Sequence, residues 1–174
     1  MKVDELKKMV RDVSDFPKEG IIFKDITPIL KDKEAWNSVI DILAEKLKVI
    51  NIDFIVGIEA RGFVFGATLA YCLGVGFIPI RKKGKLPYKT GSVTYDLEYG
   101  QDSLEIHLDA LEKGDNIVIV DDLLATGGTV KATRELIEER EANLICAVFF
   151  IELSFLKGRD KLEGLDIISI LSYD

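Results

Sequence analysis

The amino-acid sequence predicts an α/β fold in which helices flank a mainly parallel, doubly wound sheet. Short apolar runs such as FIVGI (residues 54–58) and NIVIV (residues 116–120) are typical of buried strands, and segments with helical spacing alternate with them. The length of 174 residues, 48% of them hydrophobic, suits one domain with a sizeable core. Ligands of such sheets bind beyond the carboxyl ends of the strands, so functional residues are expected in the strand-to-helix turns.

The individual elements follow from apolar spacing and from breaker residues. The expected helices cover residues 2–12, 33–48, 62–73 and 129–140, and the expected strands cover residues 54–58, 75–80, 92–99, 103–108, 116–120, 142–153 and 166–172. The runs at 92–99 and 103–108 alternate and are joined by GQD, which predicts an antiparallel hairpin. Residues 18–31 are expected to be irregular because Gly20 and Pro28 interrupt them, and Trp36 is expected to anchor its helix in the core.

The charge balance excludes some classes of function. The formal net charge is -7 at pH 7, which argues against non-specific binding of nucleic acid or of anionic membranes as the main activity. A local basic pocket for an anionic ligand remains compatible with that balance. Cys72 and Cys146 both lie in apolar runs, so they are expected to be buried, in a protein of a reducing, cytoplasmic compartment.

One uncharged run is long enough to span a membrane. Residues 62–80 carry no charge over 19 positions. Gly74 and Gly76 divide the run into a helix and a strand whose sizes suit an α/β core, so no membrane segment is expected. The N-terminal segment is charged and periodic, unlike a signal peptide.

The stretch VIVDDLLATGGT, residues 118–129, gives the strongest functional signal. A buried strand runs into Asp121 and Asp122, and a loop with two glycines then opens a helix. The N–H groups of such a loop approach a phosphate closely, and paired carboxylates accept hydrogen bonds from paired hydroxyls. The pattern therefore predicts a binding site for a ribose 5-phosphate. The alternative is an ordinary N-capped turn between strand and helix, which would be favoured if the two glycines stood alone. The spacing differs from that of nucleoside triphosphate and dinucleotide loops.

This stretch resembles the ribose-phosphate motif of type I phosphoribosyltransferases, which move ribose 5-phosphate from phosphoribosyl pyrophosphate (PRPP) to a base. The resemblance implies the fold of that family and runs from about Phe16 to Tyr173, with four motifs in the expected order. It implies that Asp121 and Asp122 bind the ribose hydroxyls. It also implies that the 5-phosphate is bound by Ala125, Thr126, Gly127, Gly128 and Thr129.

Two further stretches carry groups suited to a pyrophosphate. In VGIEARGF a strand ends in a turn with an arginine, which is a fit donor for phosphate oxygens; a structural turn with a surface ion pair is an equal alternative. The resemblance makes Glu59, Ala60, Arg61 and Gly62 the pyrophosphate loop, where the family often has a non-proline cis peptide.

The basic turn RKKGKLPYKT stands out in an acidic chain, although a solvated turn explains most of its lysines. The resemblance selects Arg81 and Lys85 as pyrophosphate ligands, with Lys85 reaching towards a neighbouring subunit's site.

Two segments resemble the family members that act on adenine. For YDLEYGQDSLEIH, the resemblance implies a lid at about residues 81–108, with Glu98 and Tyr99 as catalytic residues. The alternative for this stretch is a plain hairpin without a functional role. In FPKEGIIFKDITPIL, packing against the core is the alternative. The resemblance there implies an adenine-binding hood at about residues 14–31. It implies that the backbone of Ile22 and Lys24 contacts the base and that Phe23 stacks on it. Leu153 would cover the opposite face of the ring. Many relatives carry arginine at the position of Lys24.

The implied activity is transfer of ribose 5-phosphate from PRPP to adenine, giving AMP and pyrophosphate. The alternatives are transfer to another base, PRPP sensing without turnover, or a structural subunit; a nucleic-acid-binding element is not expected before the hood. His107 is the only histidine, so no protein-built metal site is expected; Mg²⁺ would arrive on PRPP as cofactor. The family is commonly a homodimer.

Overall fold

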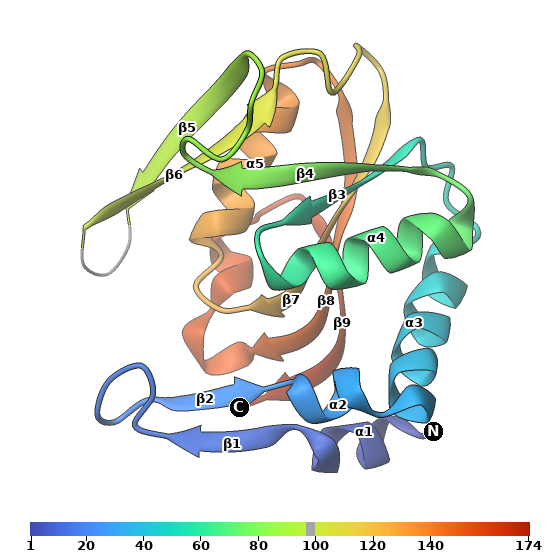
Figure 1. Cartoon of the computed structure of the whole chain (residues 1–174), viewed down its shortest axis with the longest axis vertical. Coiled ribbons are helices and arrows are strands. Elements are labelled where there is room, and N and C mark those ends of the chain that lie inside the picture. Colours follow the sequence, from blue (N-terminus) through green and yellow to red (C-terminus); the bar gives the residue numbers. More distant parts are fainter. Residues whose placement is uncertain (97–99) are drawn as a thin grey trace.

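The computed structural model describes residues 1–96 and 100–174, which fold into two sheets and their helices (Figure 1). Along the chain the elements are α1 (Val3–Met9), β1 (Arg11–Ser14), β2 (Ile22–Asp25), α2 (Thr27–Lys31), α3 (Lys33–Leu47), β3 (Phe54–Ile58), α4 (Arg61–Leu73), β4 (Gly76–Lys82), β5 (Thr90–Asp96), β6 (Gln101–His107), β7 (Asn116–Leu124), α5 (Gly128–Glu138), β8 (Asn143–Leu153), the 3₁₀ turns η1 (Ser154–Leu156) and η2 (Gly158–Lys161), and β9 (Asp166–Tyr173).

The main sheet has the strand order β5-β6-β4-β3-β7-β8-β9. Strands β4, β3, β7, β8 and β9 are parallel, and the hairpin β5–β6 adds to β4 in the antiparallel sense. Because β4 and β7 lie on opposite sides of β3, the order of the strands reverses between β3 and β7. Ligand sites of open α/β sheets form at this reversal. The expected mainly parallel, doubly wound sheet is therefore confirmed.

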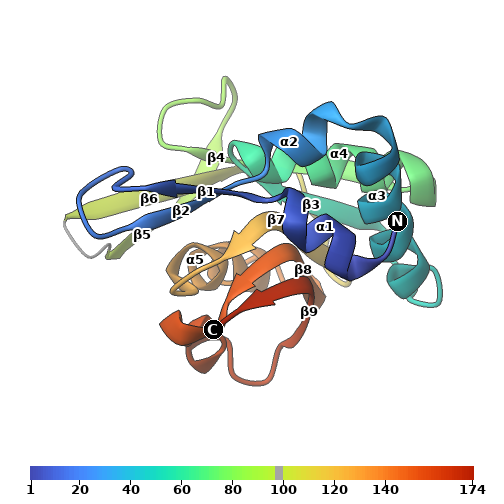
Figure 2. The ribbon, with the colours of Figure 1, turned by 90° about the horizontal axis from the view of Figure 1, so that it is seen from below.

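Helices cover both faces of this sheet, and alternate residues of β7 supply each core. Val118 and Val120 pack on the side of α3 and α4, whereas Ile117 and Ile119 pack on the side of α5. All four are fully buried. Figure 2 shows α3 and α4 on one side of the sheet and α5 on the other. An apolar run without alternation is what a strand buried on both faces requires.

Two hairpins extend from the side towards which the arrowheads of β3, β4 and β7 point (Figure 1). The first, β1–β2, forms the small second sheet, and the second is β5–β6. The carboxyl ends of the central strands therefore lie between them.

The N-terminal expectations were partly wrong. The first helix ends at Met9 instead of residue 12, and Arg11–Ser14 pair with Ile22–Asp25 as a hairpin. Residues 18–31, expected to be irregular, contain β2 and α2. Pro28 is tolerated because it lies in the first turn of α2, where its missing N–H has no partner to lose.

Two other expectations also need correction. Strand β7 continues to Leu124 instead of ending at residue 120, because the long neighbour β8 pairs with Asp121, Leu123 and Leu124. Cys72 is exposed, on the outer side of α4 beside Tyr71, while Cys146 is buried as expected. No helix within residues 1–96 and 100–174 has the length and apolar character needed to cross a membrane.

Candidate functional site

A cavity of about 290 Å³ lies at the reversal between β3 and β7. Three parts of the chain meet there: the turn after β3, the end of β7 with the following loop, and the strands β4 to β6. The described lining residues are Ile58, Glu59, Ala60, Arg61, Lys82, Tyr95, Asp102, Leu104, Asp121, Asp122 and Thr129. The cavity thus unites two motifs that lie about sixty positions apart in the sequence.

The two adjacent carboxyl groups of β7 lie where a negative charge is unfavourable. Burial, and next to it the charge of Asp122, raises the pKa of Asp121 well above its ordinary value of 3.8. Burial also raises the pKa of Asp122, although Arg61 opposes the shift. The Asp121 side chain accepts a hydrogen bond from the backbone N–H of Asp122 at 2.9 Å. Two adjacent carboxyl groups offer neighbouring oxygens that can accept hydrogen bonds from paired hydroxyls.

Arg61 joins this acidic pair to the N-terminal hairpin. Its Nε lies 3.1 Å from Oδ2 of Asp122, and the side chain of Asp122 is only 5% exposed against 39% for Arg61. The guanidinium of Arg61 also lies over the ring of Phe23, with Cζ 5.0 Å from the ring centroid. One arginine therefore contacts both the predicted ribose site and the predicted base site.

Glu59 and Arg81 form a second ion pair beside the cavity. Arg81 donates from Nε and Nη2 to the two carboxylate oxygens of Glu59, each at 3.2 Å, and the N–H of Lys82 adds a third bond at 3.0 Å. The hydrogen bonds from Arg81 hold the pKa of Glu59 below its ordinary value despite burial. Arg81 further donates to the carbonyl of Lys85 at 3.0 Å. Glu59 therefore orients Arg81 and shapes the basic turn.

The sequence did not single out Lys82 or Asp102, which also line the cavity. Lys82 Nζ lies 2.9 Å from Asp102 Oδ2, and this hydrogen bond raises the pKa of Lys82. Tyr95 lies opposite Asp102 in the β5–β6 ladder, and its hydroxyl accepts a hydrogen bond of 3.4 Å from Thr129. The signal that could have found these residues is the alternation of side chains along the hairpin strands, which places every second residue on the same side of the sheet as Lys82.

The loop 125–129 opens α5 as predicted. Gly127 has φ 78° and is the N-terminal cap residue, and Gly128 begins the helix. On the other side, Gly62 packs against the end of β7 so closely that a Cβ atom would lie 2.8 Å from both Asp121 Oδ1 and the Val120 carbonyl oxygen. Glycine at this position therefore lets α4 approach the acidic pair.

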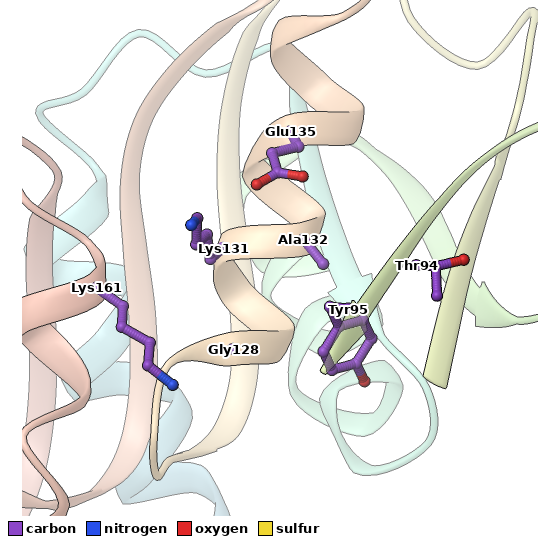
Figure 3. Close-up of a pocket in the computed structure, with 7 residues that line it drawn as sticks. All are labelled: Thr94, Tyr95, Gly128, Lys131, Ala132, Glu135 and Lys161. Atoms are coloured by element: carbon purple, nitrogen blue, oxygen red, sulfur yellow. The ribbon is translucent and has the colours of Figure 1, made fainter. Parts of the chain in front are cut away.

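A second hollow of about 290 Å³ lies on the far side of Tyr95 (Figure 3). In the figure the ring of Tyr95 lies beside Ala132 of α5, and Lys161 extends from η2 towards Gly128. The described lining residues are Thr94, Tyr95, Gly128, Lys131, Ala132, Glu135 and Lys161. Tyr95 is thus a wall common to both hollows.

The predicted hood residues lie on and beside β2. Ile22 is 56% exposed, and the ring of Phe23 meets that of Phe16 edge-on at 5.2 Å. Lys24 is engaged elsewhere: its Nζ lies 2.6 Å from Asp12 and over the ring of Tyr173. Its side chain is therefore directed away from a base role, which leaves its backbone groups for that purpose.

The remaining predicted residues are more scattered. Leu153 ends β8 and packs partly against the core. Lys85 belongs to the exposed basic turn. Glu98 and Tyr99 lie outside the described residues. The peptide bond between Glu59 and Ala60 is cis, at the position that the resemblance indicated.

Within the described part of the chain, no group of three or more His, Cys, Asp or Glu side chains is arranged to hold a metal ion. Of the four acids that line the cavity, Glu59, Asp102 and Asp122 are each paired with a cationic side chain. This donor set fits a metal that is held mainly by ligand oxygens and water.

The chain resembles known proteins along nearly its whole length. It matches the model of the phosphoribosyl transferase domain over residues 26–168. It is 59% identical to the adenine phosphoribosyltransferase of Halothermothrix orenii, over 96% of this chain and 98% of the relative.

Solved structures agree with this. The crystal structure of adenine phosphoribosyltransferase from Thermoanaerobacter pseudethanolicus is 55% identical, with a TM-score of 0.97 over 99% of this chain and 100% of that one. The Saccharomyces cerevisiae enzyme, solved with adenine and an imino-altritol bisphosphate, is 46% identical, with a TM-score of 0.91 over 97% of each chain. The chain therefore belongs to the phosphoribosyltransferase family, within the group of adenine phosphoribosyltransferases.

Proposed function

We propose that this chain transfers ribose 5-phosphate from PRPP to adenine, giving AMP and pyrophosphate. The observation that carries the proposal is the cavity between β3 and β7, where Arg61, Asp122 and Thr129 line one space. The cationic side chain suits the diphosphate of PRPP, and the carboxylates suit the diol of its ribose. The N-terminus of α5 suits the 5-phosphate. The names of the relatives supply the base.

In this proposal the end of β7 holds the sugar. Asp121 and Asp122 accept hydrogen bonds from the ribose hydroxyls, and residues 125–129 bind the 5-phosphate through backbone N–H groups and the hydroxyls of Thr126 and Thr129. Glu59, Ala60, Arg61 and Gly62 form the pyrophosphate turn, and Arg81 and Lys85 add positive charge. The bond between ribose C1 and pyrophosphate breaks while adenine N9 attacks from the opposite face. Positioning and charge stabilisation supply much of the rate.

The base half is the hood at about residues 14–31. Phe23 stacks on adenine, the backbone of Ile22 and Lys24 reads its edge, and Leu153 covers the opposite face. The exposure of Ile22 and the alternative contacts of the Lys24 side chain support backbone readout. We assign the lid to about residues 81–108 of a single domain spanning 1–174. Glu98 stabilises the developing charge or handles the purine proton, and Tyr99 closes over the sugar; both assignments rest on the family resemblance.

We propose Mg²⁺ as cofactor, carried by the diphosphate of PRPP. When bound, it neutralises charge on the departing pyrophosphate. The pairing of Glu59, Asp102 and Asp122 with cationic side chains supports a metal held chiefly by PRPP oxygens and water.

We further propose a homodimer in the cytoplasm. The outer side of α4 exposes Val64 at 43% and Tyr71 at 87%, an apolar surface suited to a second copy. A solution mass of twice 19.4 kDa would support the dimer, and a monomer mass would contradict it. Two free cysteines, one of them exposed, fit a reducing compartment; fractionation of cells would test the location.

A base panel tests the proposed activity directly. Purified chain, PRPP and Mg²⁺ are incubated separately with adenine, hypoxanthine, guanine, xanthine and orotate. We expect AMP from adenine and no nucleotide from the other bases. Turnover of another base would contradict the hood assignment, and PRPP binding without any turnover would favour a PRPP-sensing regulator.

Replacing Phe23 by leucine is expected to raise the KM for adenine about tenfold, because stacking of a base on an aromatic ring contributes roughly 1–3 kcal/mol. The KM for PRPP should change little. Phe16→Leu is the matched control: it removes another hood ring, which meets Phe23 only edge-on. Equal effects of the two substitutions on adenine would refute the stacking role of Phe23.

A further inference from the structure

The segment after β8 lies against the loop 125–129 with backbone facing backbone. A Cβ atom on Gly158 would overlap the carbonyl oxygen of Ala125 and lie 3.1 Å from Cδ1 of Leu124. A Cβ atom on Gly127 would overlap the carbonyl oxygen of Gly158. Gly127 and Gly158 are both buried. Only two glycines allow the two chain segments to come this close.

An ion pair with a buried carboxylate fixes the residue next to Gly158. Arg159 donates from Nε and Nη2 to the two carboxylate oxygens of Glu152 at 2.6 and 2.7 Å. Glu152 is 7% exposed and also accepts a hydrogen bond of 2.7 Å from Ser169. The hydrogen bonds from Arg159 hold the pKa of Glu152 below its ordinary value despite burial. A bidentate arginine pair of this kind fixes geometry as well as charge.

Further contacts fix the segment to three elements. Arg159 Nη1 donates to the carbonyl of Ile167 in β9 at 3.3 Å, and Glu152 belongs to β8. Leu162 is 1% exposed in the core beneath α5, and Arg134 of α5 donates to the carbonyl of Glu163 at 3.0 Å. η2 is thus held from both sides, and it cannot move away from the loop without breaking buried contacts.

We propose that Gly158, held in place by the Glu152–Arg159 pair, is a positioning element for the 5-phosphate loop. Backbone N–H groups bind an anion only when the loop presents them in one direction, and the loop residues Ala125 and Gly127 rest on Gly158. The inference rests on the proposed function, since it assigns no new ligand. It adds residues of a different strand and turn to the determinants of PRPP affinity.

The test is Gly158→Ala, with Gly164→Ala as the matched control. Gly164 lies in the same region with φ 77°, and a Cβ atom there meets nothing within 4 Å, so its substitution strains the backbone without touching the loop. We expect Gly158→Ala to raise the Kd and KM for PRPP roughly ten- to a hundredfold, the effect of an ångström-scale misplacement. The KM for adenine should stay within about twofold, because the hood does not rest on Gly158. Gly164→Ala should leave both constants unchanged.

A milder variant covers the case in which Gly158→Ala does not fold. Arg159→Lys keeps the charge but loses the bidentate geometry, and we expect it to raise the KM for PRPP a few-fold with kcat retained. Unchanged PRPP affinity in folded Gly158→Ala, or equal losses for adenine and PRPP, would overturn the positioning role. If Gly158→Ala does not fold, an Arg159→Lys variant that binds PRPP as tightly as the wild type would also overturn the positioning role. Failure of the wild-type chain to bind PRPP by calorimetry would instead refute the proposed function.

Discussion

Replacing both Asp121 and Asp122 by asparagine is expected to weaken PRPP binding by about a hundredfold or more. Hydrogen bonds to charged groups contribute roughly 1.5–3 kcal/mol each, and the double substitution removes two charged acceptors from the proposed diol site. Adenine binding should change little, because the hood lies on another element. Calorimetry with PRPP and with adenine measures both affinities. Unchanged PRPP affinity would remove the diol assignment.

The same substitution is expected to stabilise the fold at neutral pH. The pKa values of Asp121 and Asp122 are raised chiefly by burial above the ordinary 3.8, so the folded chain retains protons that the unfolded chain releases. Their contribution to stability is therefore full below pH 3.8 and is lost as pH rises towards the folded pKa values. Asparagine carries no charge and avoids that loss.

Thermal unfolding at several pH values measures this effect. The melting temperature of the double variant should exceed that of the wild type near pH 7, and the difference should shrink towards pH 3.8, the ordinary pKa. Asp41→Asn combined with Asp109→Asn is the control, since it makes the same charge change at two exposed positions. A lower melting temperature of the site variant at neutral pH would show that Arg61 compensates the pair fully. The combined outcome would be a functional site that lowers stability.

Arg61→Ala is expected to lower kcat/KM for PRPP by about a hundredfold, because a charge-assisted donor to the pyrophosphate is lost. The affinity for adenine should not fall with it. The guanidinium of Arg61 lies over the ring of Phe23, so its removal uncovers the stacking surface. The Kd for adenine in the absence of PRPP should therefore stay equal or fall.

Steady-state kinetics and calorimetry of Arg61→Ala and Arg61→Lys separate these effects. Lysine keeps the charge but not the planar fork, so its PRPP constants should lie between those of wild type and alanine. If Arg61→Ala lost as much affinity for adenine as for PRPP, this prediction would be wrong. That result would show that Arg61 supports the hood instead of covering it.

Much of the fold could be predicted because its signals are local. The apolar strands 54–58 and 116–120 and the helix at 33–48 are recognised from spacing alone, and the structure confirms them. The hairpin β1–β2 was missed because its hydrogen bonds join residues far apart, as Arg11 and Asp25 are. Strand β7 passes its predicted end for the same reason, since β8 supplies the missing partners. Cys72 was misplaced because an apolar run hides which side of a helix faces outward.

The site shows the same division. Glycines and acids in turns after strands identify Asp121, Asp122 and Arg61, which the structure brings into one cavity. The sequence could not show that Arg81 is oriented by Glu59, or that Gly158 packs against the loop 125–129, because both contacts join distant segments. Lys82 was read as part of a solvated turn, yet its pairing with Asp102 places it at the cavity.

The hood depends on the last strand of the chain. Lys7 and Lys24 both lie over the ring of Tyr173, Lys7 donates to the carbonyl of Ser172 at 2.6 Å, and the hydroxyl of Tyr173 reaches back to the carbonyl of Lys7. Protein synthesis runs from the N-terminus, so Ser172 and Tyr173 emerge from the ribosome long after the N-terminal residues that they contact. Arg61, at the start of α4, and Asp122, in β7, leave the ribosome well before β9. We therefore expect Arg61 and Asp122 to pair first. The hood and the Arg159 pair that fixes Gly158 are expected to be held in place only later, when β9 has emerged.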